Sequence, residues 1–255
     1  MLKSCNSPFL KKPFGGLTAN QLRLMALIIM FMDHSYYTIL PQFNWLTMIG
    51  RLAFPIFAFQ LVEGFFHTSD RKRYRHRLLF FGLISEIPFD YMIYSTIFYP
   101  YHQNVMFTLA IGLWCMEGIE EGKKCTVPWR GLLHTVARVT LCYLLAVFGM
   151  VDYRQLGLMT ILVFYFFRDF PMAWLGQLAG MFVFHQLTYE GRYYIIPFLG
   201  MELEIYKQAI AILALILIWL YNGKKGRSSK TLQYAAYTFY PAHLLILGIL
   251  KQLIW

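Results

Sequence analysis

The chain has 255 residues, of which 58% are hydrophobic and only 14% are charged, with a net charge of +10. Because an ordinary soluble domain carries about 25% charged residues, this chain has too few to coat a globular surface in polar side chains. The composition excludes disordered, collagen-like, coiled-coil and ordinary soluble chains, and it predicts that lipid surrounds most of the molecule.

Segments that could span a membrane follow one another along the chain, since a transmembrane helix needs about 20 mostly apolar residues. Residues 193–204 are apolar but too short and too interrupted by Pro197 and Gly200 to cross, so we expect a re-entrant or interfacial piece there. The sequence predicts an all-α, polytopic integral membrane helical bundle with about nine transmembrane helices, and eight to ten are allowed. We expect a single domain over residues 1–255, in which residues 1–20 form a short cytoplasmic segment. The expected spans are 21–40, 44–66, 77–97, 104–119, 131–150, 155–167, 172–189, 205–221 and 231–252.

The distribution of Lys and Arg predicts the orientation, because cytoplasmic loops of membrane proteins are enriched in both residues. With the N-terminus in the cytoplasm, sixteen of them lie in cytoplasmic loops and four in outer loops or ends. We therefore expect a multi-pass protein of the bacterial cytoplasmic (inner) membrane and no nucleic-acid partner. The basic segment 67–77 is then a cytoplasmic retention loop, with a site for an anionic ligand or lipid head group as the alternative.

Two residues of the first span indicate a function. An ionisable residue inside the bilayer is costly unless it is paired or faces a cavity, so each one is a functional hypothesis. His34 is expected about 20 Å from the inner end of its span. Arg23 lies on the same helix face about 16 Å closer to the cytoplasm, because eleven steps of about 100° end only about 20° past three full turns. This spacing suits an elongated ligand whose anionic end binds Arg23 while its reactive end reaches His34.

Other ionisable residues are expected at the depth of His34, just outward of the bilayer midplane. They are Asp33, Arg51 and Asp90, together with Tyr240 and His243 on the last span. Agreement among four helices predicts a shared polar chamber. Asp33 points about 100° away from His34, so we expect Arg51 to pair with Asp33 or Asp90. Such a pair could also serve helix packing alone.

The remaining buried polar residues have more than one interpretation. Glu86 shares a helix face with Asp90, and two carboxylates on one face need a cation or a proton. Glu63, at the inner end of the second span, is expected to pair with the basic segment. We expect the four cysteines, Cys5, Cys115, Cys125 and Cys142, and the lone residues His134 and His185, to be packing residues.

Five stretches of the chain resemble the TraX family of membrane proteins, whose members are named for the N-terminal acetylation of pilin in conjugation systems. That family in turn resembles acyltransferase 3-like membrane acyltransferases, which carry an Arg and a His separated by ten residues in the first helix. Arg23 and His34 match this spacing, so the resemblance implies that His34 is the catalytic base and that Arg23 contacts acyl-CoA from the cytosol. The stretches are LRLMALIIMFMDHSYY (22–37), IGRLAFPIFAFQLVEGFFHTSD (49–70), LISEIPFDYM (83–92), QNVMFTLAIGL (103–113) and YPAHLLIL (240–247).

The resulting hypothesis is a membrane-embedded N- or O-acyltransferase that moves an acetyl group from cytosolic acetyl-CoA to an amine or hydroxyl acceptor. The expected acceptor is a pilin-like N-terminus, a glycan or a lipid, and no metal is expected. A proton-coupled transporter or flippase, and a non-catalytic assembly factor of a conjugation or secretion system, are the alternatives. The expected site residues are His34, Arg51, Asp33 and Asp90 for catalysis, Arg23, Glu63, Arg71 and Arg73 for the cofactor, and Glu86, Asn104, Tyr240 and His243 for the acceptor.

Overall fold

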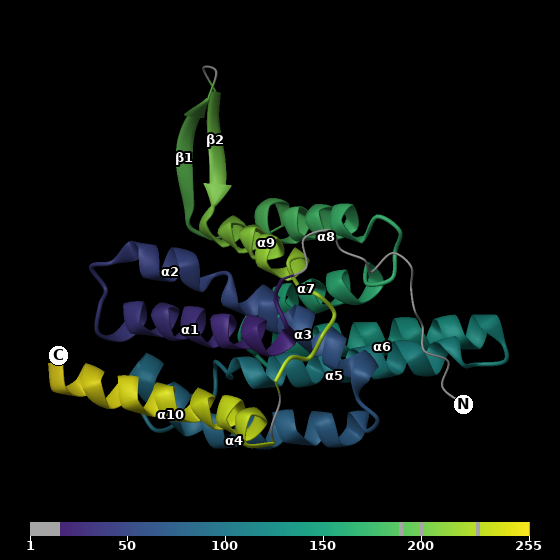
Figure 1. Cartoon of the computed structure of the whole chain (residues 1–255), viewed down its shortest axis with the longest axis horizontal. Helices are drawn as coiled ribbons and strands as arrows, with labels where there is room; N and C mark the ends of the chain where they lie inside the picture. The colour runs from purple at the N-terminus through teal and green to yellow at the C-terminus, as the bar shows by residue number, and fades with distance from the viewer. Residues whose placement is uncertain (1–15, 189–190, 199–200, 228–229, 255) are drawn as a thin grey trace.

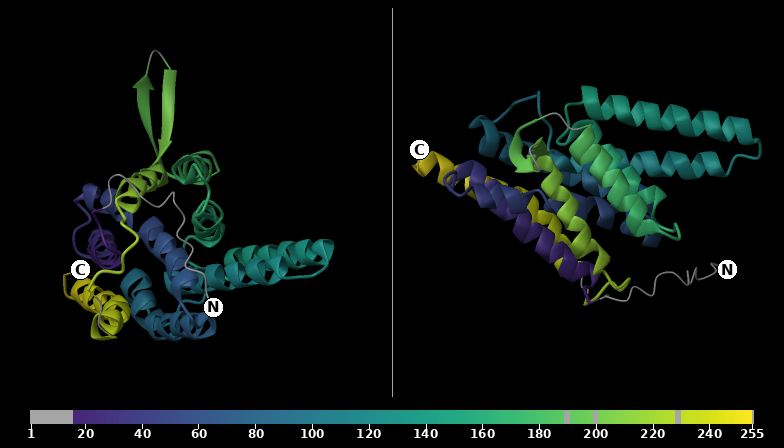
Figure 2. Two further views of the ribbon diagram at one scale, coloured as in Figure 1. Left: turned by 45° about the vertical axis from the view of Figure 1, so that its right-hand side comes forward. Right: turned by 90° about the horizontal axis from the view of Figure 1, so that it is seen from above.

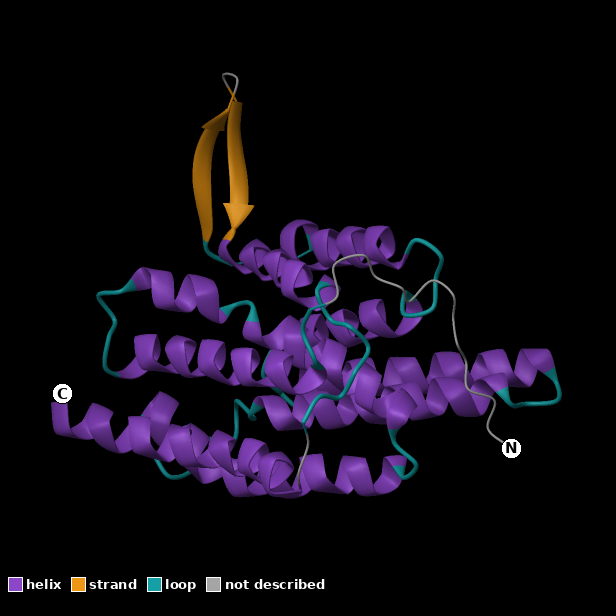
Figure 3. Ribbon diagram, viewed as in Figure 1, coloured by secondary structure: helices purple, strands orange, loops and turns teal. Residues whose placement is uncertain are grey.

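The computed structural model describes residues 16–188, 191–198, 201–227 and 230–254, which are predominantly helical (Figures 1 and 3). The expected all-α class therefore holds for the bundle, and one antiparallel hairpin of β1 and β2 stands out from it. Most of the expected segment 1–20 lies outside the described residues. The elements are α1 (Ala19–Thr38), α2 (Asn44–Gly50), α3 (Ala53–His67), α4 (Arg71–Tyr94), α5 (Val105–Lys123), α6 (Pro128–Phe148), α7 (Arg154–Phe166), α8 (Ala173–Phe182), the π-helix η2 (Val183–Leu187), β1 (Tyr193–Phe198), β2 (Met201–Tyr206), the 3-10 helix η3 (Lys207–Leu213), α9 (Ala214–Trp219) and α10 (Lys230–Ile254).

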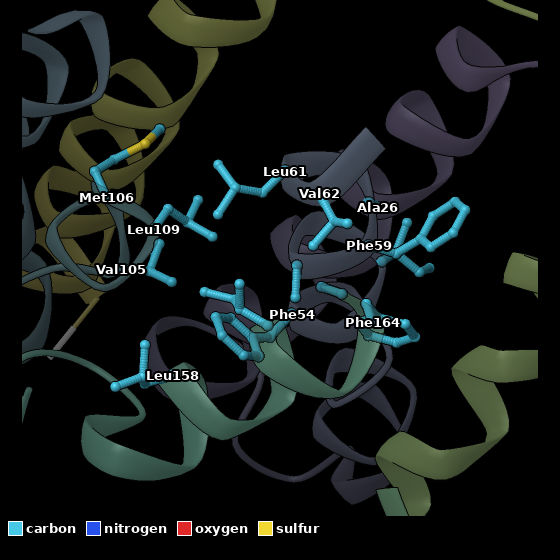
Figure 4. Packing of buried hydrophobic residues seen from close by; sticks show 14 of the residues in the cluster. Ala26, Phe54, Phe59, Leu61, Val62, Val105, Met106, Leu109, Leu158 and Phe164 are labelled. Atoms are coloured by element: carbon cyan, nitrogen blue, oxygen red, sulfur yellow. The ribbon is translucent and has the colours of Figure 1, made fainter. Parts of the chain in front are cut away.

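Helix α3 lies at the centre of the bundle, where it packs against α1, α5, α7 and α9. Helix α10 returns from the far end of the chain and packs against α1 and α4. Figure 4 shows apolar side chains from α1, α3, α5 and α7 meeting in the core, among them Ala26, Phe54, Val105 and Leu158. This packing brings the first, second and last predicted spans together, as a shared chamber requires.

The second expected span is two helices, because the chain turns at Arg51 and Leu52 between α2 and α3. Pro55 explains the turn, since it has no N–H to donate to the Arg51 carbonyl and fits only the first turn of a helix. Gly50 is required at the end of α2, because a Cβ there would lie 2.4 Å from the Cβ of Asp33. The break therefore places the backbone at Arg51 directly against α1.

Two expectations about local structure need correction. The basic segment predicted as a loop is helical from Arg71 onward, because Asp70 caps α4 by accepting a hydrogen bond from the Arg73 N–H at 2.8 Å. The segment 193–204 forms the hairpin of β1 and β2, with Pro197 opposite Glu202. Its aromatic and β-branched residues explain the strands, and the hairpin projects from the bundle beside α9 (Figure 1).

Two segments of the described chain are long and apolar enough to cross a membrane, Asn44–His67 and Pro128–Phe148. The second is α6, which forms with α5 an arm that projects from the bundle (Figure 2). Leu132, Leu133 and Phe148 on α6 are 65%, 61% and 76% exposed. Exposed apolar surface on this scale needs lipid or protein to cover it. These helices indicate a membrane protein, and the count of nine spans stays a prediction.

The cysteines follow the expectation in part. Cys115 on α5 and Cys142 on α6 are buried, so both are packing residues in the structure. Cys125 is exposed in the turn between these helices, which corrects its assignment as a packing residue. Cys5 lies outside the described residues.

Candidate functional site

Two cavities lie one behind the other along α1, and we call them outer and inner in keeping with the predicted orientation. The outer cavity has a volume of about 1150 Å³ and is lined by His34, while the inner cavity has about 110 Å³ and is lined by Arg23. Both cavities therefore open onto the helix face that the sequence predicted for these two residues. The residues that line both cavities are Met30, Phe57, Val105 and Tyr240.

His34 forms a pair with His243 in the outer half of the bundle. The two rings are nearly parallel, at 7°, and His34 Nδ1 lies 2.7 Å from His243 Nε2. His243 Nδ1 lies 2.7 Å from the Phe239 carbonyl, which can only accept, so this nitrogen is the donor. When both rings are neutral, His243 Nε2 accepts from His34 Nδ1–H, and the lone pair of His34 is on Nε2. No described residue forms a hydrogen bond with that nitrogen, so it is available as a base.

The last helix holds this pair in place. His243 is 3% exposed and Tyr240 is 2% exposed, and the Tyr240 ring packs against that of His243 at 5.7 Å between centroids. Tyr240 lines both cavities together with Val105 at the start of α5. Because α10 also packs against α1, the imidazole pair is fixed between two helices that are far apart in the sequence.

Arg51 enters the outer cavity from the turn between α2 and α3. Its Nη2 donates to the Tyr37 hydroxyl at 2.9 Å and its Nη1 donates to Gln208 Oε1 at 3.3 Å. Asp33 also lines the cavity, and its carboxylate is in electrostatic contact with Arg51. Of the two partners that the sequence left open for Arg51, the structure favours Asp33. The arginine is thus held on one side and faces the cavity that contains His34.

His185 helps to hold Arg51 in place through Gln208. It is fully buried on η2, where Nε2 lies 2.9 Å from the Thr160 hydroxyl of α7 and Nδ1 lies 3.3 Å from Gln208 Nε2. Gln208 is therefore held by His185 on one side and accepts from Arg51 on the other. The expectation that His185 only fills space is incomplete, since its ring links α7 to Arg51.

A second polar group also lines the outer cavity. His102 Nδ1 lies 2.7 Å from the Tyr94 hydroxyl, and its Nε2 lies 3.6 Å from an oxygen of Asp152. Tyr153 and Arg154 next to Asp152 have positive φ values of 62° and 41°, and such backbone strain is frequent at functional sites. The sequence did not single out this group, because His102, Asp152, Tyr153 and Arg154 lie outside the expected spans and only Tyr94 lies inside one. Seven tyrosines line the same cavity, namely Tyr37, Tyr94, Tyr99, Tyr101, Tyr143, Tyr153 and Tyr240.

Three expected site residues lie at the junction of α4 and α5 and do not line the outer cavity. Asp90 accepts a hydrogen bond from the Tyr99 N–H at 2.7 Å, so it is not the partner of Arg51. Glu86 accepts from the backbone N–H of Asn104 at 2.8 Å and from its side chain. Asn104 also donates to the Gly82 carbonyl and caps α5 by accepting from the Met106 N–H. These contacts tie α4 to α5, so Glu86 has a structural role in the bundle.

The residues that the sequence assigned to the cofactor do not lie together in one site. Arg23 lines the inner cavity. Glu63 forms an ion pair with Arg168 at 2.7 Å and lies 3.9 Å from His67 Nδ1 at the start of the basic segment. Arg71 lies over the Phe65 ring at 3.9 Å, and Arg73 is exposed. Spacing along the sequence could not find these partners, because Arg168 is 105 positions from Glu63.

Comparisons with known proteins agree on one family. The profile of the family described as "TraX protein" matches residues 18–251. A similar protein is the "Probable fimbrial assembly protein FimC, serogroup H1" of Dichelobacter nodosus, which is 29% identical over 251 residues, covering 92% of this chain and 96% of that protein. No solved structure matches the chain.

Proposed function

Because this chain belongs to the TraX family, we propose that it is a membrane-embedded acyltransferase that moves an acetyl group from cytosolic acetyl-CoA to an amine or hydroxyl acceptor. One observation carries the proposal. A narrow cavity lined by Arg23 and a wide cavity lined by His34 share lining residues and lie on one helix face. A narrow passage suits the slim arm of the donor, and a wide chamber suits a bulkier acceptor.

The proposed chemistry uses His34 as a general base. Its free Nε2 takes a proton from the acceptor amine or hydroxyl, whose nitrogen or oxygen attacks the thioester carbon. The C–S bond then breaks, a C–N or C–O bond forms, and the leaving thiolate takes the proton back from His34. His243 acts as a positioning residue, because its hydrogen bond selects the tautomer and spreads the positive charge of the protonated ring.

Arg51 is the proposed electrophilic group. The thioester oxygen becomes negative as the acceptor adds, and a fixed cation stabilises such an oxyanion in a site with little water. Tyr37 and Gln208 hold the guanidinium, so little reorganisation is needed during the reaction. Asp33 keeps Arg51 at the cavity wall in this proposal.

The proposed arrangement in the membrane has about nine crossings with the N-terminus in the cytoplasm, in keeping with the spacing of apolar segments. The large exposed apolar side chains on α6 support lipid contact. In this orientation the inner cavity faces the cytosol, where the donor is made. The outer cavity then receives its acceptor from the membrane or from outside.

The printed name of the relative from Dichelobacter nodosus, a fimbrial assembly protein, supports a pilus-related role. A pilin-like N-terminus is therefore the favoured acceptor, ahead of a glycan or a lipid. Carboxylates at Asp33 and Asp152 line the outer cavity and could orient an amine. They give the proposal a physical reason for an amino-terminal substrate.

The proposal is tested with purified full-length protein, labelled acetyl-CoA and a synthetic peptide that carries a pilin-like N-terminus. We expect label transfer, or thioester hydrolysis without acceptor, in the wild type and neither in His34→Ala. A folded wild-type protein that neither binds CoA nor transfers label contradicts the proposal. Flux of a substrate into liposomes under a pH gradient would then favour the transporter, and normal pili in cells with His34→Ala would favour an assembly factor.

A further inference from the structure

Two turns at the outer end of the bundle bring a second pair of ionisable side chains together. His102 lies in the turn between α4 and α5, and Asp152 lies in the turn between α6 and α7. Backbone hydrogen bonds join the two turns, from the Gln103 N–H to the Met150 carbonyl at 3.0 Å and from the Asp152 N–H to the Gln103 carbonyl at 2.8 Å. The backbone therefore fixes the positions of His102 and Asp152 relative to each other.

His102 lies between a tyrosine and this carboxylate. Its Nδ1 lies 2.7 Å from the Tyr94 hydroxyl, and its Nε2 lies 3.6 Å from Asp152 Oδ1. The same oxygen accepts a hydrogen bond from the Tyr153 N–H at 3.0 Å, which fixes the direction of the carboxylate. The side chains of His102 and Asp152 are 31% and 32% exposed, and both line the outer cavity. A molecule bound in the outer cavity can therefore reach both.

The charges around His102 attract a cation. Glu86 and Asp90 of α4 are in electrostatic contact with its imidazole. Asp152 faces its Nε2 from the second turn, and the phenol of Tyr94 is its other titratable neighbour. Three carboxylates thus surround one imidazole at the wall of the outer cavity, and their combined field favours a positively charged ligand group there.

An amine acceptor brings one proton more than a hydroxyl acceptor does. An α-amino group has a pKa of about 7.7–8.0 in solution, so at neutral pH it arrives mostly as an ammonium, which has no lone pair. One proton must leave before the nitrogen attacks the thioester, and another leaves during the attack. In the proposed chemistry His34 accepts only the second of these protons and returns it to the thiolate. The first proton needs a different acceptor.

We propose that Asp152 and His102 bind the ammonium form of the acceptor and remove this first proton, which makes an amine the preferred acceptor. The inference rests on the proposed function. His102 Nδ1–H donates to the Tyr94 hydroxyl, so its lone pair is on Nε2. One N–H bond of the ammonium breaks, its proton binds His102 Nε2, and the electron pair stays on the nitrogen that then attacks the acetyl carbon with His34 as the base. The imidazolium pairs with Asp152 until it releases the proton to solvent at the outer cavity.

The test uses full-length protein in phosphatidylcholine nanodiscs and two acceptors. One is the peptide with a pilin-like N-terminus, and the other is the same peptide with an α-hydroxyl in place of its α-amine. At about pH 6.5, where the amine is charged, Asp152→Asn and His102→Gln should each lower the rate of acetyl transfer to the amine at least about tenfold relative to the wild type. At about pH 9.5, where the amine is neutral, both variants should approach the wild-type rate. Transfer to the α-hydroxyl peptide should be unchanged at either pH.

The variants are conservative, because asparagine at position 152 keeps an acceptor for the Tyr153 N–H. Asp169→Asn removes an exposed carboxylate in the turn between α7 and α8 and serves as the matched control, with unchanged rates for both acceptors. Wild-type rates with the amine at about pH 6.5 in folded Asp152→Asn and His102→Gln would overturn the inference and leave the proposed function standing. Equal losses with both acceptors would indicate a structural role and would also overturn it.

A binding measurement without acetyl-CoA separates this inference from the proposed function. The wild type should bind the amine peptide at least about tenfold more tightly than the α-hydroxyl peptide, as expected for hydrogen bonds to a charged group, and Asp152→Asn should lose this preference. If the wild type shows the preference but neither transfers acetyl groups nor hydrolyses acetyl-CoA, the ammonium site stands and the proposed function fails. If the wild type shows no preference between the peptides, the ammonium site is overturned.

Discussion

Two groups of polar side chains in the bundle, the Glu86–Asn104 pair and the His34–His243 pair, differ in whether their hydrogen-bonding atoms are all paired. At the junction of α4 and α5, Glu86 and Asn104 bind each other, the Gly82 carbonyl and the end of α5. In the outer cavity, His34 is fixed through Nδ1 while Nε2 has no described partner. Burial of an ionisable residue among apolar helices is therefore not enough to identify a site. The atom that remains free beside a cavity is what distinguishes a reactive residue from a structural one.

The largest expected effect comes from His34→Ala. Loss of a general base costs about 10²-fold to 10⁴-fold in rate, and we expect the acetyl-transfer rate to fall by this amount. Because His34 is half-buried beside an existing cavity, the midpoint of unfolding in an SDS titration should change little. Wild-type turnover in folded His34→Ala would show that the free Nε2 atom does not mark a reactive residue.

The comparison predicts the opposite outcome for Asn104→Ala. Removing the side chain deletes its hydrogen bonds to the Gly82 carbonyl and to Glu86, which then keeps only the backbone N–H of residue 104. A lost hydrogen bond costs about 0.5–1.5 kcal/mol, or about 1.5–3 kcal/mol where one partner is charged. The free energy of unfolding, measured by denaturant titration, should fall while turnover per folded molecule stays near that of the wild type. Asn104→Ser keeps an acceptor that can cap α5 and should recover part of the loss. Full stability in Asn104→Ala would contradict the structural role.

A smaller effect is expected for His243→Ala, because this residue positions the base rather than contacting the substrate. We expect kcat for acetyl transfer to fall about tenfold to a hundredfold, as for partners that orient a functional imidazole. The KM for acetyl-CoA should be nearly unchanged. His243→Gln keeps a side-chain acceptor for His34 Nδ1–H and should retain more activity than His243→Ala. Equal loss in both variants would count against tautomer selection.

The dependence of the rate on pH sharpens the assignment of the base. Only neutral His34 can take a proton, so the rate with a hydroxyl acceptor should fall on the acid side. The ordinary pKa of histidine is about 6.5, and below the operative pKa the rate should drop tenfold for each unit of pH. A flat acid limb in the wild type would show that no neutral base is needed.

The smallest effect is expected for His185→Ala, which acts through Gln208 on Arg51. We expect kcat to fall severalfold and the rescue variant His185→Gln to restore most of it, because a glutamine can still link Thr160 to Gln208. The measurement is the separate determination of kcat and KM. A change in KM alone, or no rescue, would indicate a packing role instead.

Much of the architecture could be predicted from the sequence. The position of α1 and its shared face for Arg23 and His34 followed from helical periodicity. The common depth of His34 and His243 followed from counting residues. Local structure was harder to predict from the sequence. The hairpin of β1 and β2 lies where an interfacial piece was expected, and the turn at Arg51 interrupts the expected continuous second span. Both departures depend on short-range chemistry, namely the aromatic and β-branched residues of the hairpin and the proline at position 55.

The amino-acid sequence by itself determined the family, the helical class, the apolar surface and which ionisable residues lie deep in the bundle, because these depend on composition and on regular spacing. Only the tertiary structure decided which polar atoms are paired. His34 and His243 are 209 positions apart. A hydrogen bond between them requires that the two side chains point toward each other as well as lie at the same depth in the bundle. The two side chains face each other only when α1 and α10 pack together, so the contrast between the paired Glu86 and Asn104 and the open cavity beside His34 exists only in the folded chain.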